Sequence, residues 1–293
     1  MKKIAILGSQ GMLGSMVASY FRGIKDMPDY ECTALGREMF DALTSDILKL
    51  NEYDWIINCI GIIKPNINEE DFESVENAIL VNSGFPHYLA RIDAKIIQIE
   101  TDCVFSGLFS DKEYKESDPH DPLDVYGKTK SLGEVKRDGY YHIRTSIVGP
   151  ELANHKSLMD WLLFQPRNAE IKGFVNHHWN GITTLAFAKL CLAIIKNEDL
   201  VMPELIHFTP KDQVSKLTLL NLLTEAFNRK DIKISQAYAP KDVNRILTTE
   251  FLETRNQLWD LAGYDKVPHV RDLIFELADY IHDWNYMEEL NKI

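Results

Sequence analysis

The sequence predicts an α/β fold in which a doubly wound parallel sheet is followed by a smaller, mostly helical lobe. Through the first 150 residues, short apolar runs alternate with amphipathic stretches, which is the pattern of strands covered by helices on both faces. A glycine-rich turn follows the first apolar run and opens a helical pattern. After Pro150 the patterns are mainly helical, and this change marks the second lobe.

The predicted strands of the first domain are short and rich in isoleucine and other apolar residues, which indicates burial on both faces. In order they are Lys3–Leu7, Cys32–Leu35, Trp55–Ile60, Lys95–Ile99 and His142–Ile147. Between them lie the amphipathic stretches Met12–Phe21, Phe72–Arg91 and Val125–Lys136. Strand and helix in alternation predict right-handed crossovers, with residues 1–150 as the first domain.

The second lobe, residues 151–293, has four helical patterns and one short strand pattern. The helices are predicted over Ser157–Phe164, Thr183–Lys196, Leu217–Asn228 and Val270–Tyr286, and the strand near Glu204–Phe208. We expect residues from about 180 to 208 to pack back on the first domain.

Composition excludes several classes of protein. The 293 residues are 45% apolar and 26% charged, as in ordinary folded proteins, and the net charge is −12 with no Lys/Arg-rich run. We therefore expect no nucleic-acid or membrane partner. The sequence shows no signal peptide or membrane span, and its four scattered cysteines lack metal-ligand spacing, so it predicts a cytoplasmic protein without a metal site. The sequence does not fix the oligomeric state. A homodimer is the assembly that we consider.

The glycine-rich turn, Gly8–Gly14, predicts a dinucleotide site. A Rossmann-type domain needs small residues there for a tight turn, for close approach to a pyrophosphate and for packing of the helix on the sheet. The amide groups at the start of that helix then face the phosphates. The residues expected to line the cofactor are Gly8, Gln10, Gly11, Met12, Leu13 and Gly14.

The end of the second strand indicates which nicotinamide cofactor is bound. An acidic residue there accepts a hydrogen bond from a ribose 2′-hydroxyl, whereas a cation accommodates a 2′-phosphate. Here the strand is followed by Gly36 and Arg37, which favours NADPH, with NADH as the alternative. We expect Asp46 and Ile47 to hold the adenine ring. The residues Cys59 and Gly61 close the third strand, where the cofactor must pass.

Tyr126 and Lys130 are spaced four residues apart on a predicted helix, so they share one face. A phenol is a poor acid-base catalyst at neutral pH until a nearby cation favours its ionised form, and Lys130 would supply that charge. Lys130 would also bond the nicotinamide ribose. Thr101 follows the fourth strand, at the edge of the sheet where ligands of open α/β folds bind, and would donate to a substrate carbonyl.

Several motifs in order resemble the dTDP-4-dehydrorhamnose reductase branch of the extended short-chain dehydrogenases/reductases. They are Ile99–Gly107, Tyr114-x-Glu116-x-Asp118, Pro122, Val125–Glu134 and Ile143–Ser146. The resemblance covers most of the chain and weakens after about residue 150. It implies NADPH-dependent reduction of the 4-keto group of a nucleotide-linked 6-deoxy sugar, in deoxysugar and polysaccharide biosynthesis, with Thr101, Tyr126 and Lys130 as the catalytic residues.

Cys103 departs from that branch, in which an aromatic residue is usual. The related GDP-fucose and UDP-rhamnose synthases place a catalytic cysteine there and epimerise before they reduce. The thiol would act as acid or base beside the ketone, or it would simply fill a strand end. The second group that epimerisation needs would be Lys172, His177 or His178, which lie near the Lys or His of those relatives.

The resemblance also suggests residues that would bind the sugar nucleotide. Arg245 resembles the family's phosphate-binding arginine, and a guanidinium suits phosphate. The remaining substrate candidates are Lys64, Thr101, Asp102, Cys103, Tyr126, His177, His178 and Trp179.

Three functions remain open at this point. The first is reduction of a UDP- or dTDP-linked 4-keto-6-deoxyhexose, with an N-acetyl group at C2 and prior C3 or C3/C5 epimerisation left open. The second is simple reduction of dTDP-4-dehydrorhamnose. The third belongs to another class, a non-catalytic regulatory subunit like the β subunit of methionine adenosyltransferase.

Overall fold

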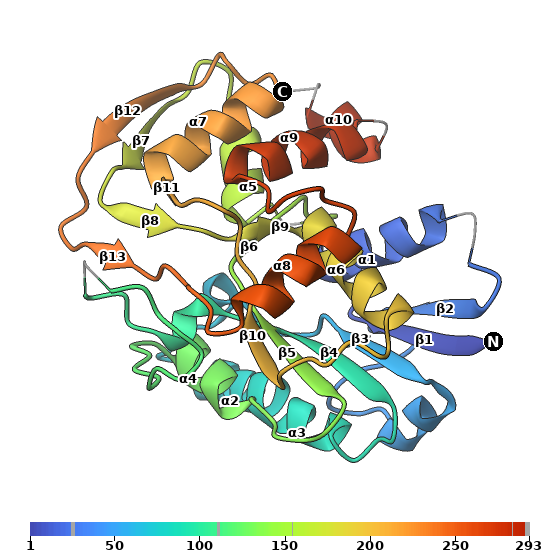
Figure 1. Cartoon of the computed structure of the whole chain (residues 1–293). Helices are drawn as coiled ribbons and strands as arrows, with labels where there is room; N and C mark the ends of the chain where they lie inside the picture. The colour runs from blue at the N-terminus through green and yellow to red at the C-terminus, as the bar shows by residue number, and fades with distance from the viewer. Residues whose placement is uncertain (25–26, 110–111, 154, 283, 291–293) are drawn as a thin grey trace.

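A six-stranded, fully parallel sheet forms the centre of the protein in the computed structural model, which describes residues 1–24, 27–109, 112–153, 155–282 and 284–290 (Figure 1). The strand order is β2-β1-β3-β4-β5-β10, and every neighbouring pair runs parallel. The strands are β1 (Lys2–Leu7), β2 (Tyr30–Leu35), β3 (Trp55–Asn58), β4 (Lys95–Glu100), β5 (Tyr140–Arg144) and β10 (Leu205–His207). The predicted doubly wound parallel sheet is confirmed.

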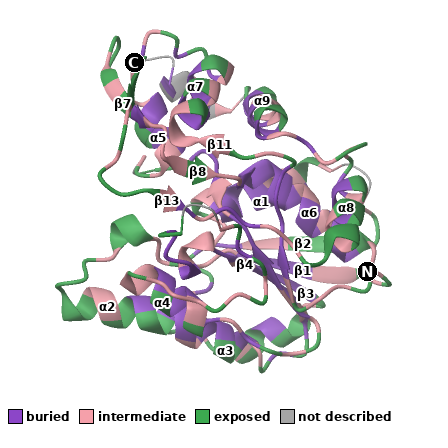
Figure 2. Ribbon diagram, turned by 60° about the vertical axis from the view of Figure 1, so that its left-hand side comes forward, coloured by how far each residue is buried: buried purple, intermediate pink, exposed green. Residues whose placement is uncertain are grey.

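Helices cover both faces of this sheet, because its strands alternate apolar side chains between two cores. In β1, Ile4 and Ile6 join the core formed with α1 (Met12–Gly23) and α6 (Thr184–Lys196). The alternate residues Ala5 and Leu7 belong to a second core on the opposite face. That face carries α2 (Phe72–Ile79), α3 (Phe85–Leu89) and α4 (Val125–Leu132), as Figure 2 shows below the buried strands.

The second lobe combines helices with short strands. Its helices are α5 (Leu158–Leu163), α7 (Lys216–Ala226), α9 (Val270–Tyr280) and α10 (Asn285–Leu290), and α8 (Leu252–Leu261) packs against α6. Its small sheets are β11-β8-β13, β12-β7 and β6-β9. These strands are β6 (Ile147–Val148), β7 (Glu170–Phe174), β8 (His177–Trp179), β9 (Ile182–Thr183), β11 (Val214–Ser215), β12 (Lys233–Ala237) and β13 (Val243–Asn244).

Two later segments of the chain complete the first domain. The predicted strand near Glu204–Phe208 is β10, which pairs with β5 at the edge of the sheet. Helix α6 packs along α1. Within the described ranges, no helix combines the length and the apolarity that a membrane span requires.

Several predicted elements have different boundaries in the structure. The predicted helix Phe72–Arg91 is divided by a π-helical turn, η3 (Leu80–Gly84), just before Pro86, which cannot donate a helical hydrogen bond. The predicted helix Val270–Tyr286 ends at Tyr280, and its position 283 lies outside the described residues. Three short 3₁₀ helices complete the list of elements: η1 (Ile47–Glu52), η2 (Lys64–Asn66) and η4 (Asp102–Val104).

Candidate active site

Two adjoining cavities form one crevice at the carboxyl edge of the sheet, where ligands of open α/β folds bind. The first cavity measures about 480 Å³ and the second about 460 Å³. Both are lined by residues that follow β1 and β3, so the two cavities are neighbours. The shared residues are Gln10, Gly11, Cys59, Ile60 and Gly61.

The glycine turn at the floor of the crevice fits a dinucleotide. Gly8 has a φ of +73°, which an L side chain rarely adopts. A Cβ on Gly14 would lie 2.1 Å from the Gly8 carbonyl oxygen, so helix α1 reaches the turn only because that position is glycine. Gly11 begins the helix without a side chain, which leaves the first amides of α1 open to a phosphate. Met12 and Leu13 continue along the second cavity.

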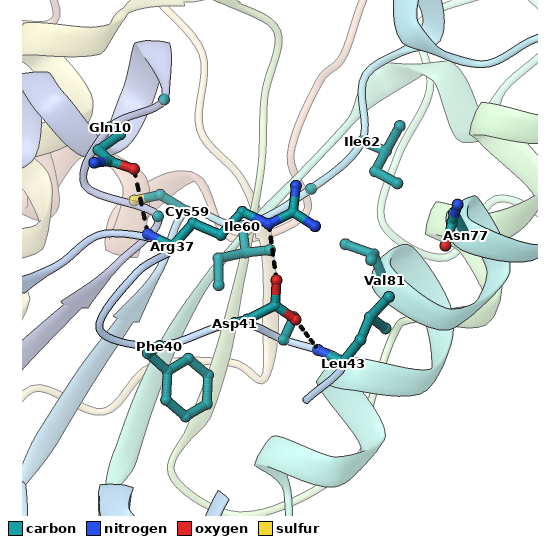
Figure 3. Close-up of a pocket in the computed structure, with 14 residues that line it drawn as sticks. Gln10, Arg37, Phe40, Asp41, Leu43, Cys59, Ile60, Ile62, Asn77 and Val81 are labelled. Carbon is teal, nitrogen blue, oxygen red and sulfur yellow. Dashed lines mark hydrogen bonds and ion pairs between the residues drawn. The ribbon is translucent and has the colours of Figure 1, made fainter. Parts of the chain in front are cut away.

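Arg37 lines the first cavity, as Figure 3 shows. Its Nε donates to Asp41 Oδ2 at 2.8 Å, and its two terminal nitrogens extend beyond that contact. An amide hydrogen bond from Leu43 and the Arg37 guanidinium together lower the pKa of Asp41, so this carboxyl is ionised at neutral pH. The guanidinium is therefore oriented by a neighbouring carboxylate while its outer edge remains open.

We expected Asp46 and Ile47 to hold the adenine ring, but neither residue lines this cavity. The Asp46 carboxylate instead caps η1 by accepting from the Leu48 amide at 3.0 Å. The wall of the cavity is formed by the preceding turn, through Phe40, Asp41, Ala42 and Leu43, and by Asn77 and Val81 of the facing helices.

The second cavity brings Thr101, Tyr126 and Lys130 together. Thr101 directly follows β4 and is 7% exposed, while Tyr126 and Lys130 lie one turn apart on α4. Helix α4 approaches the strand end very closely, because a Cβ on Gly127 would lie 2.2 Å from the Cys103 carbonyl oxygen. The absence of a side chain at Gly127 thus allows the helix to present Tyr126 beside Thr101.

Burial is the main influence on the phenol of Tyr126 and raises its pKa above the ordinary value. The nearby Cys103 thiol adds to this, and a side-chain hydrogen bond with Thr101 opposes it. The Lys130 ammonium donates to the Ile99 carbonyl oxygen at 2.9 Å and lies 3.0 Å from Glu100 Oε2. Tyr126 is accordingly protonated at neutral pH. The expected lowering of its pKa by Lys130 is not found in this structure, where the Lys130 ammonium is paired with Glu100.

Cys103 and Arg245 meet at the edge of the second cavity. Arg245 Nε donates to the Phe105 carbonyl oxygen at 2.8 Å, and its Nη1 lies 3.7 Å from Cys103 Sγ. Burial, and then the negative charge of Asp102, raise the pKa of the Cys103 thiol to about 12, so the thiol is neutral at physiological pH. Arg245 thus lies against Cys103, a residue of the cavity lining, although it is not part of that lining itself.

The other substrate candidates fall into two groups. Lys64 and Asp102 line the second cavity, and Lys64 is paired with Asp124 at 2.7 Å. The second group does not line this cavity. Trp179 Nε1 donates to Ser146 Oγ at 2.8 Å, and His177 Nε2 lies 3.2 Å from the Lys241 carbonyl oxygen. The side chains of His178 and Lys172 are exposed.

Sequence reasoning missed two charged residues of the site. Glu100 lines the cavity beside Lys130. The sequence feature that could have identified it is an acidic residue at the end of a largely apolar strand. Lys216, the first residue of α7, is half-buried and interacts electrostatically with Asp102 and Cys103. It comes from the other lobe, and no local pattern marks it.

A Rossmann-type sheet, a glycine turn and a Tyr-Lys pair beside a strand-end threonine define the extended short-chain dehydrogenase/reductase fold. The chain matches the RmlD substrate binding domain over residues 1–254. It therefore belongs to that family.

Curated relatives carry several names. The chain is 35% identical over 147 residues to a dTDP-4-dehydrorhamnose reductase of Aggregatibacter actinomycetemcomitans, covering 46% of each chain. It is 31% identical over 147 residues to the Bacillus subtilis spore coat polysaccharide biosynthesis protein SpsK, covering 46% of this chain and 47% of that one. These matches span about half the length of the two relatives. Methionine adenosyltransferase 2 subunit beta of Xenopus laevis is 23% identical over 248 residues, 78% of this chain and 72% of that one.

Solved structures match almost the whole chain. A dTDP-4-dehydrorhamnose reductase from Clostridium acetobutylicum superposes with a TM-score of 0.73 at 22% identity, covering 96% of this chain and 99% of that one. The reductase from Bacillus anthracis, solved in complex with NADP, also gives 0.73, at 17% identity and with the same coverage. At these identities the likeness shows the fold.

Proposed function

We propose that the protein is an NADPH-dependent reductase of the C4 keto group of a UDP- or dTDP-linked 4-keto-6-deoxyhexose. The observation that carries the proposal is the convergence of Thr101, Tyr126 and Lys130 in a cavity that the glycine turn also lines. Membership of the RmlD family and the names of the curated relatives support the same substrate class.

Each residue of the site would have a separate role in this reaction. NADPH, when bound, would supply the hydride that sugar C4 receives. Tyr126 donates its phenolic proton to the carbonyl oxygen as that oxygen gains negative charge, and the Thr101 hydroxyl orients the same oxygen by a hydrogen bond. Lys130, whose ammonium lies 3.0 Å from Glu100 Oε2, would bind the nicotinamide ribose.

Loss of NADPH absorbance with a panel of 4-keto-6-deoxy sugar nucleotides tests this function. The panel contains UDP- and dTDP-linked sugars, with a hydroxyl or an N-acetyl group at C2. We expect turnover of at least one member, which would identify the base and the C2 substituent. No turnover of any member, with NADPH bound, would contradict the proposal.

Arg37 is expected to select NADPH over NADH. Replacing Arg37 with Ala removes the cation at the cavity edge, so the Kd for NADPH should rise about tenfold or more while that for NADH stays within about twofold. Fluorescence titration of both cofactors measures this. An exposed arginine outside the cavity, Arg91, provides the control as Arg91→Ala. Equal losses for both cofactors would mean that Arg37 does not read the 2′-phosphate.

Epimerisation at C3, or at C3 and C5, before reduction is the second candidate function. Cys103 favours it, because the thiol lines the same cavity as Thr101 and Tyr126. Since burial keeps this thiol protonated, it would return a proton to a ring carbon after a base on the opposite face of the ring had removed one. Lys172, His177 and His178, the expected bases, lie outside the cavity lining, so this candidate function needs another base.

Turnover in D₂O distinguishes an epimerase-reductase from a simple reductase. An epimerising enzyme leaves deuterium at C3 or C5 of the product, and Cys103→Ala should reduce that incorporation at least tenfold. Mass spectrometry of the product measures it. A parent enzyme that leaves C3 and C5 free of deuterium is a simple dehydrorhamnose-type reductase, and Cys103 is then a packing residue.

The relationship to methionine adenosyltransferase subunit beta raises the rival proposal of a non-catalytic regulatory subunit. The same sugar-nucleotide panel decides between them, because a regulatory subunit would bind NADPH and oxidise none. The intact catalytic trio favours the enzyme.

A further inference from the structure

Asp160 of the second lobe carries a buried carboxyl group that the reaction described above does not use. It lies on α5, and its side chain has no exposed surface. Asp160 itself lines neither cavity of the crevice. Because a buried carboxyl group is unfavourable unless polar groups bond to it, its partners indicate which parts of the structure it joins.

Among the described residues, three donors converge on the two oxygens of Asp160. The Glu151 amide donates to Oδ2 at 3.1 Å, and Nδ1 of His155 lies 2.7 Å from the same oxygen. The Tyr286 hydroxyl donates to Oδ1 at 2.8 Å. Glu151 and His155 precede α5, whereas Tyr286 lies on α10, 126 residues after Asp160. Asp160 therefore joins α10 to the segment before α5.

The segment before α5 forms part of the wall of the second cavity, the one that also holds Thr101 and Tyr126. The wall residues from this segment are Glu151, Leu152, Ala153 and Ser157. Among the described residues, none from this segment lines the first cavity, which begins at the glycine turn. The contacts of Asp160 thus bear on the space proposed for the sugar nucleotide and not on the Arg37 end of the crevice.

Aromatic packing joins the same three elements. The His155 ring stacks on Phe164 with 3.9 Å between the ring centroids, and the Tyr286 ring packs edge-on against Phe164 at 5.5 Å. His155 has a φ of +47°, which residues other than glycine adopt infrequently. Such a conformation persists only where the surrounding contacts determine it. The bond to Asp160 and the stack on Phe164 are the contacts that hold the backbone before α5 in this shape.

We propose that Asp160 and Tyr286 are positioning residues that fix the cavity wall Glu151–Ala153, so that α10 contributes to the affinity of the second cavity for the sugar nucleotide. Asp160 acts through the Glu151 amide and the His155 ring. The inference rests on the proposed function, because it takes the second cavity as the sugar-nucleotide site, and it extends that function to a helix that lies outside the crevice.

Tyr286→Phe tests this role by the loss of one hydroxyl. Oδ1 of Asp160 then loses its donor from α10, and the wall is held less firmly. KM for the active member of the panel should rise about threefold or more, while kcat and the Kd for NADPH stay within about twofold. Steady-state kinetics and fluorescence titration of NADPH measure these quantities.

Asp160→Asn should have a larger effect in the same direction. The asparagine side chain keeps the shape of aspartate but has one acceptor oxygen in place of two, so at least one donor loses its acceptor. KM for the sugar nucleotide should rise about tenfold, again with kcat and the Kd for NADPH nearly unchanged. A variant that merely loosened the whole enzyme would lower kcat as well.

Tyr264→Phe is the matched control. The Tyr264 hydroxyl also donates to a carboxyl oxygen, Glu276 Oε2, at 2.6 Å, but Tyr264 and Glu276 line neither cavity. Tyr264→Phe and Tyr286→Phe should lower the melting temperature by similar amounts, because each removes one hydrogen bond of the same kind. Only Tyr286→Phe should raise KM, and an equal rise in both variants would overturn the inference.

The remaining outcomes are also decisive. If Asp160→Asn does not fold, as judged by circular dichroism, Tyr286→Phe carries the test, and an unchanged KM in that variant overturns the inference. A parent enzyme that turns over no sugar of the panel overturns the proposed function, and this inference with it. Turnover with the same KM in the parent and in both variants overturns the role of Asp160 and Tyr286 alone.

Discussion

Replacing Tyr126 with Phe should lower kcat about a thousandfold or more while the Kd for NADPH changes by less than about twofold. The substitution removes one hydroxyl, the group placed to protonate the substrate oxygen, and general acid catalysis contributes up to about four orders of magnitude. The aromatic ring, which lines the second cavity, remains. Steady-state kinetics on the active member of the panel, together with fluorescence titration of NADPH, measures both quantities.

Tyr114→Phe provides the control for loss of a tyrosine hydroxyl. Tyr114 is 1% exposed and stacks on Phe105 at 4.2 Å between ring centroids, and its hydroxyl has no hydrogen-bond partner among the described residues. Removing an unpartnered buried hydroxyl should leave stability and turnover unchanged or slightly improved. If Tyr126→Phe retained most of its rate, another group would have to be the proton donor.

Replacing Gly127 with Ala should lower kcat/KM about a hundredfold and leave the NADPH affinity within about threefold. The new methyl group would meet the Cys103 carbonyl oxygen at 2.2 Å and the Pro122 side chain at 2.8 Å, so α4 must move away from the end of β4. Displacing a catalytic group by about 1 Å costs roughly two orders of magnitude in rate. Stopped-flow reduction under single-turnover conditions measures the chemical step directly.

Gly23→Ala is the matched control for Gly127→Ala. Gly23 ends α1, and the nearest atom to its added Cβ would be the Tyr280 hydroxyl at 3.9 Å, which is ordinary contact. That variant should keep its full rate. Full activity of Gly127→Ala would show that Tyr126 does not depend on the close approach of α4 to the strand end.

The predicted residues that line the crevice in the structure are encoded by local spacing. The glycine turn is one short segment, and Tyr126 and Lys130 share a face because they are four residues apart on one helix. Thr101 was placed by the rule that parallel strands bring their carboxyl ends to one edge, which the six-stranded sheet obeys. Each of these predictions depends only on the position of a residue within one turn, helix or strand and on the direction of that element.

Contacts between elements that are far apart in the chain could not be predicted from the sequence. Glu100 and His142 are 42 residues apart and meet because β4 and β5 are neighbours. Phosphate binding by Arg245 stays a prediction, whereas its contact with Cys103, 142 residues away in the chain, was not predicted. The second lobe is built from strands of two to five residues, too short to show a periodicity, so neither its sheets nor the position of Lys216 was predicted.

The central claim is that hydride reaches C4 of a nucleotide-linked sugar while Tyr126 protonates the oxygen. Turnover of the active panel member with NADPH that carries deuterium in both positions at nicotinamide C4, followed by NMR of the product, tests it most directly. The claim predicts one deuterium at sugar C4 for each NADPH oxidised, and almost none with Tyr126→Phe. Deuterium at another carbon, or an equal yield from the variant, would contradict it.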